Sequence, residues 1–127
     1  FVSSDVFIGV SQGGTVKKED IARMNKSPIV FSLANPVPEI MPGEAKAGGA
    51  AVIATGRSDF DNQINNSLGF PGIFRGALDH GVRDITDEML LMAAKKLAAL
   101  VKQPTAKQII PSTFDPRVAK SVASAIR

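Results

Sequence analysis

The sequence predicts an α/β fold: a three-layer, doubly wound parallel sheet of which this chain supplies the second half only, followed by C-terminal helices. The first observation behind this prediction is a set of short, almost continuously apolar runs rich in β-branched and aromatic residues. They occupy residues 6–10, 29–33 and 51–54. Runs of this kind are typical of strands that are buried on both faces, as in a parallel sheet.

The second observation is that helical segments separate the apolar runs. Residues 17–25 place Ile21 and Met24 among charged residues, and residues 41–48 begin with Pro42, which suits a first helical turn. Gly48 is expected to take the left-handed position that often follows the last turn of a helix. The resulting β-α-β-α-β order predicts parallel strands joined by right-handed crossovers.

The remainder of the chain, residues 61–127, predicts helices. Residues 68–78 are apolar and indicate a buried helix with a disturbed start. Residues 85–102 form an amphipathic segment with Thr86 as a plausible N-cap. Asp115 before a proline predicts the start of the last helix. We therefore divide the chain into a βαβαβ unit at 1–60 and a helical part at 61–127.

Composition excludes several classes of function. The net charge is only +3, without a basic cluster, which argues against nucleic-acid binding. The absence of Cys excludes disulfides and thiolate chemistry, and no apolar run is long enough to span a membrane. These features predict a cytoplasmic protein without nucleic-acid or membrane partners. A start at Phe1 rather than Met leads us to expect a piece of a longer polypeptide.

Small and polar residues follow each predicted strand, at 11–14, 35–36 and 55–59. In open α/β sheets, ligands bind in the crevice outside the carboxyl ends of the strands. The same residue types are also ordinary turn formers, so turn formation is an open alternative. For the amides of Asn65 and Asn66 the alternative is a simple helix cap.

Other polar residues carry weaker functional signals. His80 beside a glycine is expected to cap a helix end rather than act in catalysis. Arg57 and Asp59 are close enough in sequence to pair with each other. Arg75 can pair with an acidic residue or contact a partner surface. No set of Asp, Glu and His residues shows the spacing of metal ligands, so we predict no metal-ligating residue in this chain.

Four segments together resemble the malic enzymes, in their shorter, prokaryotic form. They are DVFIGVS at 5–11, PIVFSLANPVPEI at 28–40, ATGRSDF at 54–60 and NNSLGFPGIFRGAL at 65–78. The resemblance extends from about residue 5 to residue 127. It implies that residues 1–127 are the C-terminal half of a Rossmann-like dinucleotide-binding domain.

The resemblance also implies an activity, namely the oxidative decarboxylation of malate to pyruvate and CO₂ with NAD or NADP and Mg²⁺ or Mn²⁺. Residues at matching positions approach the cofactor in the family; here they are Gly9, Val10, Ser11, Asn35 and Asn65. The matching substrate contacts are Asn35 and Asn66. Neutral amides suit this task, because malate is a dianion that binds beside a divalent metal.

The chain departs from the family pattern where the chemistry is carried out. It contains no Tyr, so the family's Tyr acid is absent. The family's catalytic Lys, acidic metal ligands and Gly-rich phosphate loop precede the matching region. We therefore predict that this chain contains no catalytic residue and is inactive alone. We expect its partners to be the remainder of the same polypeptide and further copies in a homo-oligomer. The open alternatives are a non-catalytic nucleotide-binding or regulatory module and a half-domain of another Rossmann-type dehydrogenase.

Overall fold

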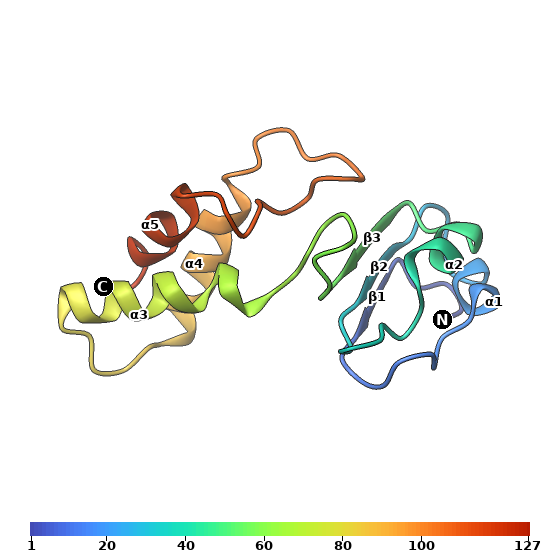
Figure 1. The fold of residues 1–127 in the computed structure, drawn as a ribbon, viewed down its shortest axis with the longest axis horizontal. Coiled ribbons are helices and arrows are strands. Elements are labelled where there is room, and N and C mark those ends of the chain that lie inside the picture. The colour runs from blue at the N-terminus through green and yellow to red at the C-terminus, as the bar shows by residue number, and fades with distance from the viewer. The chain divides into compact units, whose positions relative to one another are not determined.

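The computed structural model describes all residues from 1 to 127 and divides them into two compact units (Figure 1). The first unit comprises residues 1–64 and 105–107, and the second comprises residues 65–104 and 108–127. Each unit has its own apolar core, and each is described by itself below.

A three-stranded parallel sheet forms the centre of the first unit. Its strands are β1 (Val6–Gly9), β2 (Ile29–Ser32) and β3 (Val52–Thr55), in the order β1-β2-β3. The register aligns Gly9 with Ser32 and Ser32 with Thr55. All three strands therefore end at one edge of the sheet, called the carboxyl edge below. The predicted parallel α/β fold is confirmed.

Two short helices, α1 (Lys18–Ala22) and α2 (Pro42–Ala47), cover one face of this sheet (Figure 1). Ile21 of α1 and Ala45 of α2 pack with Val30 of β2, and all three side chains are almost fully buried. Within this unit the sheet has this single helical layer. The opposite face carries three exposed apolar side chains of one strand and its extension, namely Val6, Ile8 and Val10.

The end of α2 differs from the prediction by one residue. Gly48 has a right-handed conformation, with φ −77°, and the positive φ of +103° falls on Gly49. Gly48 serves packing instead, because a methyl group there would lie 2.6 Å from the carbonyl oxygen of Lys18 and 2.8 Å from Cβ of Ile21. The close approach of α1 and α2, rather than the turn, requires a residue without a side chain at this position.

The second unit consists of helices: the 3₁₀ turn η1 (Asn66–Leu68), α3 (Phe70–His80), α4 (Asp87–Ala98) and α5 (Arg117–Ala123). The predicted N-cap of α4 is confirmed, since the Thr86 hydroxyl accepts a hydrogen bond from the N–H of Met89. The carboxylate of Asp115 likewise accepts the N–H of Arg117 at the start of α5.

Helix α3 is not buried along its length, so that prediction is wrong. Phe70, Phe74 and Leu78 are 52%, 60% and 82% exposed. They recur every four residues and therefore share one face of the helix. The buried face is made by Gly72 and Gly76, which let α5 approach closely.

We expect Gly76→Ala to destabilise the second unit. A methyl group there would lie 2.5 Å from the carbonyl oxygen of Ala123 and 2.8 Å from Cβ of Ile126, and backbone atoms of α5 cannot yield as a flexible side chain would. The expected loss in the free energy of unfolding is about 1–3 kcal/mol, as for other overpacked cores. Denaturant unfolding measures it.

Gly43→Ala in α2 provides the matched control, because a methyl group at Gly43 meets nothing within 4 Å. It should leave the free energy of unfolding unchanged or raise it by up to about 1 kcal/mol, through the better helix propensity of Ala. Equal stabilities of Gly76→Ala and the unsubstituted protein would contradict the described packing of α3 on α5.

Candidate functional site

The loops that follow the three strands meet at the carboxyl edge of the first unit. The strand register aligns the ends of the three strands, so Ser11, Asn35 and Thr55 lie along one rim of the parallel sheet. The side chains of Ser11 and Asn35 are exposed, whereas Thr55 is buried and accepts the N–H of Arg57 on its hydroxyl oxygen. The edge thus offers neutral polar groups to solvent.

Glu39 is the residue that joins the first two of these loops. Its side chain is fully buried, and both carboxylate oxygens accept hydrogen bonds. Oε1 accepts from the N–H of Ser11 at 2.7 Å and from the hydroxyl of the same residue at 3.3 Å. Oε2 accepts from the hydroxyl of Ser32 and from the N–H of Ala34, both at 3.1 Å. One carboxylate therefore binds the chain after β1 and the chain after β2.

These hydrogen bonds determine the charge state of Glu39. Burial opposes ionisation and by itself raises the pKa, but the N–H groups of Ser11 and Ala34, its own backbone N–H and the Ser32 hydroxyl outweigh it. The pKa of Glu39 therefore lies below its ordinary value, and the side chain is an anion at neutral pH. A buried anion is compatible with a stable fold when donors of this kind surround it.

The loop after β3 contacts the loop after β2 through Gly56 and Arg57. The Asn35 amide lies against the backbone of Gly56, where a methyl group would be 3.0 Å from its nitrogen and 3.2 Å from its oxygen. The guanidinium of Arg57 donates to the carbonyl oxygen of Pro36 at 3.1 Å. The loop after β2 is thus held on one side by Glu39 and contacted on the other by the loop after β3.

The predicted pairing of Arg57 with Asp59 is confirmed, with a shortest distance of 2.7 Å between guanidinium and carboxylate. The hydrogen-bonded carboxylate raises the pKa of Arg57, and the guanidinium lowers the pKa of Asp59. The guanidinium carbon also lies 5.6 Å from the ring centre of Phe60. These contacts engage Arg57 within its own loop.

The predicted site residues fall in both units. Gly9 is buried, and Val10, Ser11 and Asn35 are exposed at the carboxyl edge of the first unit. Asn65 and Asn66 lie at the start of η1 in the second unit, where both are exposed. Asn65 caps η1, because its side-chain oxygen accepts the N–H of Ser67 at 2.9 Å. The simple-cap alternative therefore holds for the oxygen of Asn65.

The weaker candidates take structural roles. Nδ1 of His80 lies 3.0 Å from the carbonyl oxygen of Gly76 and 2.8 Å from that of Ile126, as expected for a group at a helix end. Arg75 pairs with Asp79 one turn later at 2.7 Å.

Nowhere in residues 1–127 do three or more His, Asp or Glu side chains gather in a way that could hold a metal ion. No helix has the length and hydrophobicity needed to cross a membrane.

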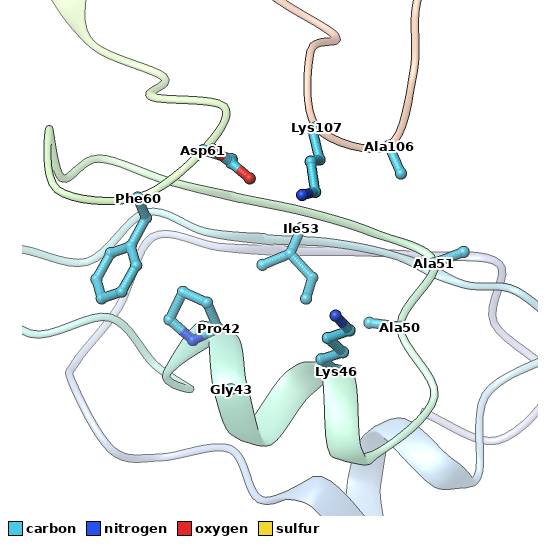
Figure 2. A pocket seen from close by; sticks show the side chains of 10 residues that line it. All are labelled: Pro42, Gly43, Lys46, Ala50, Ala51, Ile53, Phe60, Asp61, Ala106 and Lys107. Atoms are coloured by element: carbon cyan, nitrogen blue, oxygen red, sulfur yellow. The ribbon is translucent and has the colours of Figure 1, made fainter.

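A separate cavity of about 370 Å³ lies beside α2 and β3 (Figure 2). Its walls are mainly apolar, with Pro42, Ile53 and Phe60 among them, and the charged side chains of Lys46, Asp61 and Lys107 at its margin. None of the predicted site residues lines it. We therefore place the candidate site at the carboxyl edge and not in this cavity.

Sequence reasoning assigned no role to Glu39, the residue that organises the edge. The available signal was a glutamate between Pro38 and Ile40 in an otherwise uncharged stretch, which indicates a buried, partnered carboxylate. Two of its four donors are backbone N–H groups, which every residue type except proline carries. Sequence therefore could not show which groups would surround it.

A parallel half-sheet with polar loops at its carboxyl edge belongs to the Rossmann-like class of α/β folds, which bind nucleotides at that edge. Within this class, residues 1–126 match the family described as "Malic enzyme, NAD binding domain". The chain belongs to this family, as its resemblance predicted. The match decides against a half-domain of an unrelated dehydrogenase.

Individual relatives agree with the family match. The chain is 53% identical to the bifunctional malic/malolactic enzyme of Bacillus subtilis, over 98% of this chain and 31% of that protein. It is 52% identical to the NAD-dependent malic enzyme of Geobacillus stearothermophilus, over 97% of this chain and 26% of that protein. The crystal structure of malic enzyme from Pyrococcus horikoshii superposes with a TM-score of 0.94 at 53% identity, covering 98% of this chain and 29% of that one. The chain thus spans less than a third of each relative.

We expect Glu39→Gln to lower the free energy of unfolding at pH 7 by about 1.5–3 kcal/mol, the worth of a hydrogen bond to a charged group. An amide has a donor on one side, so it would oppose an N–H of either Ser11 or Ala34 with a second N–H. Urea unfolding of both proteins measures the difference.

The difference in the free energy of unfolding between the unsubstituted protein and Glu39→Gln should shrink as the pH falls. Because the folded pKa of Glu39 is lowered, its stabilising effect is fully present above the unfolded pKa of about 4.3. It is lost as the pH falls through the folded pKa, where protonated Glu39 resembles the amide. A difference between the two proteins that stays constant down to pH 2 would contradict an ionised Glu39.

Proposed function

We propose that the protein containing this chain oxidatively decarboxylates malate to pyruvate and CO₂, with NAD or NADP as the hydride acceptor. The observation that carries the proposal is the family match over residues 1–126, with identities above 50% to proteins named as malic enzymes. Residues 1–127 would be the C-terminal half of the dinucleotide-binding domain, with a βαβαβ unit at 1–60 and a helical part at 61–127.

The chemistry of the carboxyl edge is compatible with a dinucleotide. Ser11 and Asn35 are exposed residues there. The Ser11 hydroxyl donates its hydrogen to Glu39 and can still accept a hydrogen bond, and the Asn35 amide can both donate to and accept from ribose hydroxyls or a carboxamide. We propose that Gly9, Val10, Ser11 and Asn35 contact the cofactor at this edge. Asn65 is proposed to join them, through the side-chain nitrogen that its capping bond does not use.

Malate itself is proposed to contact Asn35 and Asn66. An amide N–H donates to a carboxylate without adding negative charge, so it orients a dianion and does not compete with it for a divalent cation. Both side chains are exposed, as a substrate contact requires.

The residues present do not fit the metal or the proton transfers of the reaction. The chain has no Tyr, and no acidic cluster suited to Mg²⁺ or Mn²⁺ occurs in it. We propose that the acid, the base and the metal ligands lie elsewhere in the same polypeptide, and that the active enzyme is a homo-oligomer. This chain would bind and orient the substrate and the cofactor.

The name of the Bacillus subtilis relative favours a second candidate activity, the malolactic reaction, which converts malate to lactate and CO₂. The two reactions differ in whether the dinucleotide is reduced overall. The first reduces one dinucleotide for each malate, whereas the second leaves no net reduced dinucleotide. Product analysis therefore separates them.

We expect the complete protein to produce pyruvate and reduced dinucleotide in a 1:1 ratio when supplied with malate, NAD or NADP, and Mg²⁺ or Mn²⁺. Absorbance at the reduced nicotinamide band and chromatography of the acids measure both products. Lactate without reduced dinucleotide would favour the second candidate, and turnover of neither kind would overturn the proposal.

We expect Asn66→Ala in the complete protein to lower kcat/KM for malate by roughly tenfold to a hundredfold, since one hydrogen bond to a charged carboxylate is lost. Dinucleotide affinity should change much less. Gln108→Ala is the matched control, because it removes another exposed amide of the second unit that has no proposed role. Equal malate kinetics of Asn66→Ala and the control would contradict the assignment.

A further inference from the structure

The carboxylate of Glu39 lies directly behind the loops that carry the proposed cofactor contacts. Ser11, one of those contacts, donates both its N–H and its hydroxyl to Glu39. Ala34, which also donates its N–H, is the residue before Asn35. Glu39 is itself fully buried, so it acts on a ligand only through these neighbours.

Gly9 leaves room for this carboxylate at the end of β1. A methyl group at Gly9 would lie 2.6 Å from the carboxyl carbon of Glu39 and within 3 Å of both its oxygens. The carboxylate therefore occupies the space that a side chain at Gly9 would need. A shift of Glu39 would move the chain from Gly9 to Ser11, which is the segment proposed to pass beside the cofactor.

Ser32 connects the carboxylate to its own chain. Its hydroxyl donates to Oε2 of Glu39 and accepts the N–H of Ile40 at 3.0 Å. The loop from Ser32 to Ile40 is thus closed on itself around Glu39, with Asn35 at its exposed part. All four groups that face the carboxylate oxygens are donors, and only an acceptor without hydrogens satisfies all of them.

We infer that Glu39 is a positioning residue for the dinucleotide: its carboxylate fixes the chain after β1 relative to the chain after β2, so that Ser11 and Asn35 are held ready for the cofactor. This inference rests on the proposed function, since it takes the carboxyl edge as the cofactor site. Loops that are held before binding lose less conformational freedom when the ligand arrives. The carboxylate therefore contributes to cofactor affinity without touching the cofactor.

The test is the dissociation constant for reduced dinucleotide, measured by nicotinamide fluorescence with the complete protein well below its melting temperature. Glu39→Gln preserves the shape of the side chain but opposes one backbone N–H with another. We expect the dissociation constant to rise about tenfold or more, the equivalent of one hydrogen bond to a charged group. We expect kcat at saturating dinucleotide to fall by a smaller factor.

Ile21→Val is the matched control for stability. Ile21 belongs to the apolar core of the same unit, is 1% exposed and forms none of the hydrogen bonds to Glu39. It should lower the melting temperature by a few degrees and leave the dissociation constant unchanged. An equal effect of Glu39→Gln and Ile21→Val on dinucleotide affinity would overturn the inference.

Ser32→Ala tests the positioning role of Glu39 if Glu39→Gln does not fold. It removes one donor and leaves the N–H groups of Ser11 and Ala34 bound to Glu39. A dissociation constant raised about threefold supports the inference, as the loss of one of several hydrogen bonds predicts. An unchanged value overturns it.

The inference and the proposed function fail in different ways. If the unsubstituted protein oxidises malate and Glu39→Gln binds dinucleotide normally, the inference is wrong and the function stands. If the unsubstituted protein binds dinucleotide without turning over malate and Glu39→Gln weakens that binding, the inference stands and the malate activity is wrong.

Discussion

The buried carboxylate of Glu39 is the interaction on which the carboxyl edge depends. An isolated charge in a protein interior is strongly unfavourable, and it is tolerated only where donors replace the lost water. Here the donors come from two loops that are far apart in sequence but adjacent across the β1–β2 pair. Neither loop can move away without leaving part of the charge without a partner, so the two are coupled in position.

Steric constraint works together with this electrostatic one. The carboxylate fits only because Gly9 has no side chain, and Asn35 lies against Gly56 for the same reason. The second unit uses the same device, since Gly72 and Gly76 bring α3 close to α5. Small residues thus serve close packing in both units.

The residue types at the carboxyl edge suit binding. The amides and hydroxyls along the carboxyl edge are suited to binding and orienting a polar ligand, and they neither carry charge nor titrate near neutral pH. Metal binding needs clustered ligands, and no group of three or more His, Asp or Glu side chains in residues 1–127 could hold a metal ion. In the proposed enzyme, this chain would supply groups that bind the cofactor and the substrate.

The sequence by itself determined the parallel α/β fold, the order of its elements, the capping by Thr86 and the family, because these depend on local patterns and short motifs. Tertiary structure alone decided which glycines serve packing: Gly48 lies too close to α1 for a side chain, and α3 buries its glycines instead of its phenylalanines. It also decided the role of Glu39. The physical reason is that a buried carboxylate is stable only where hydrogen-bond donors surround it. Those donors are brought together only when strands distant in sequence pair.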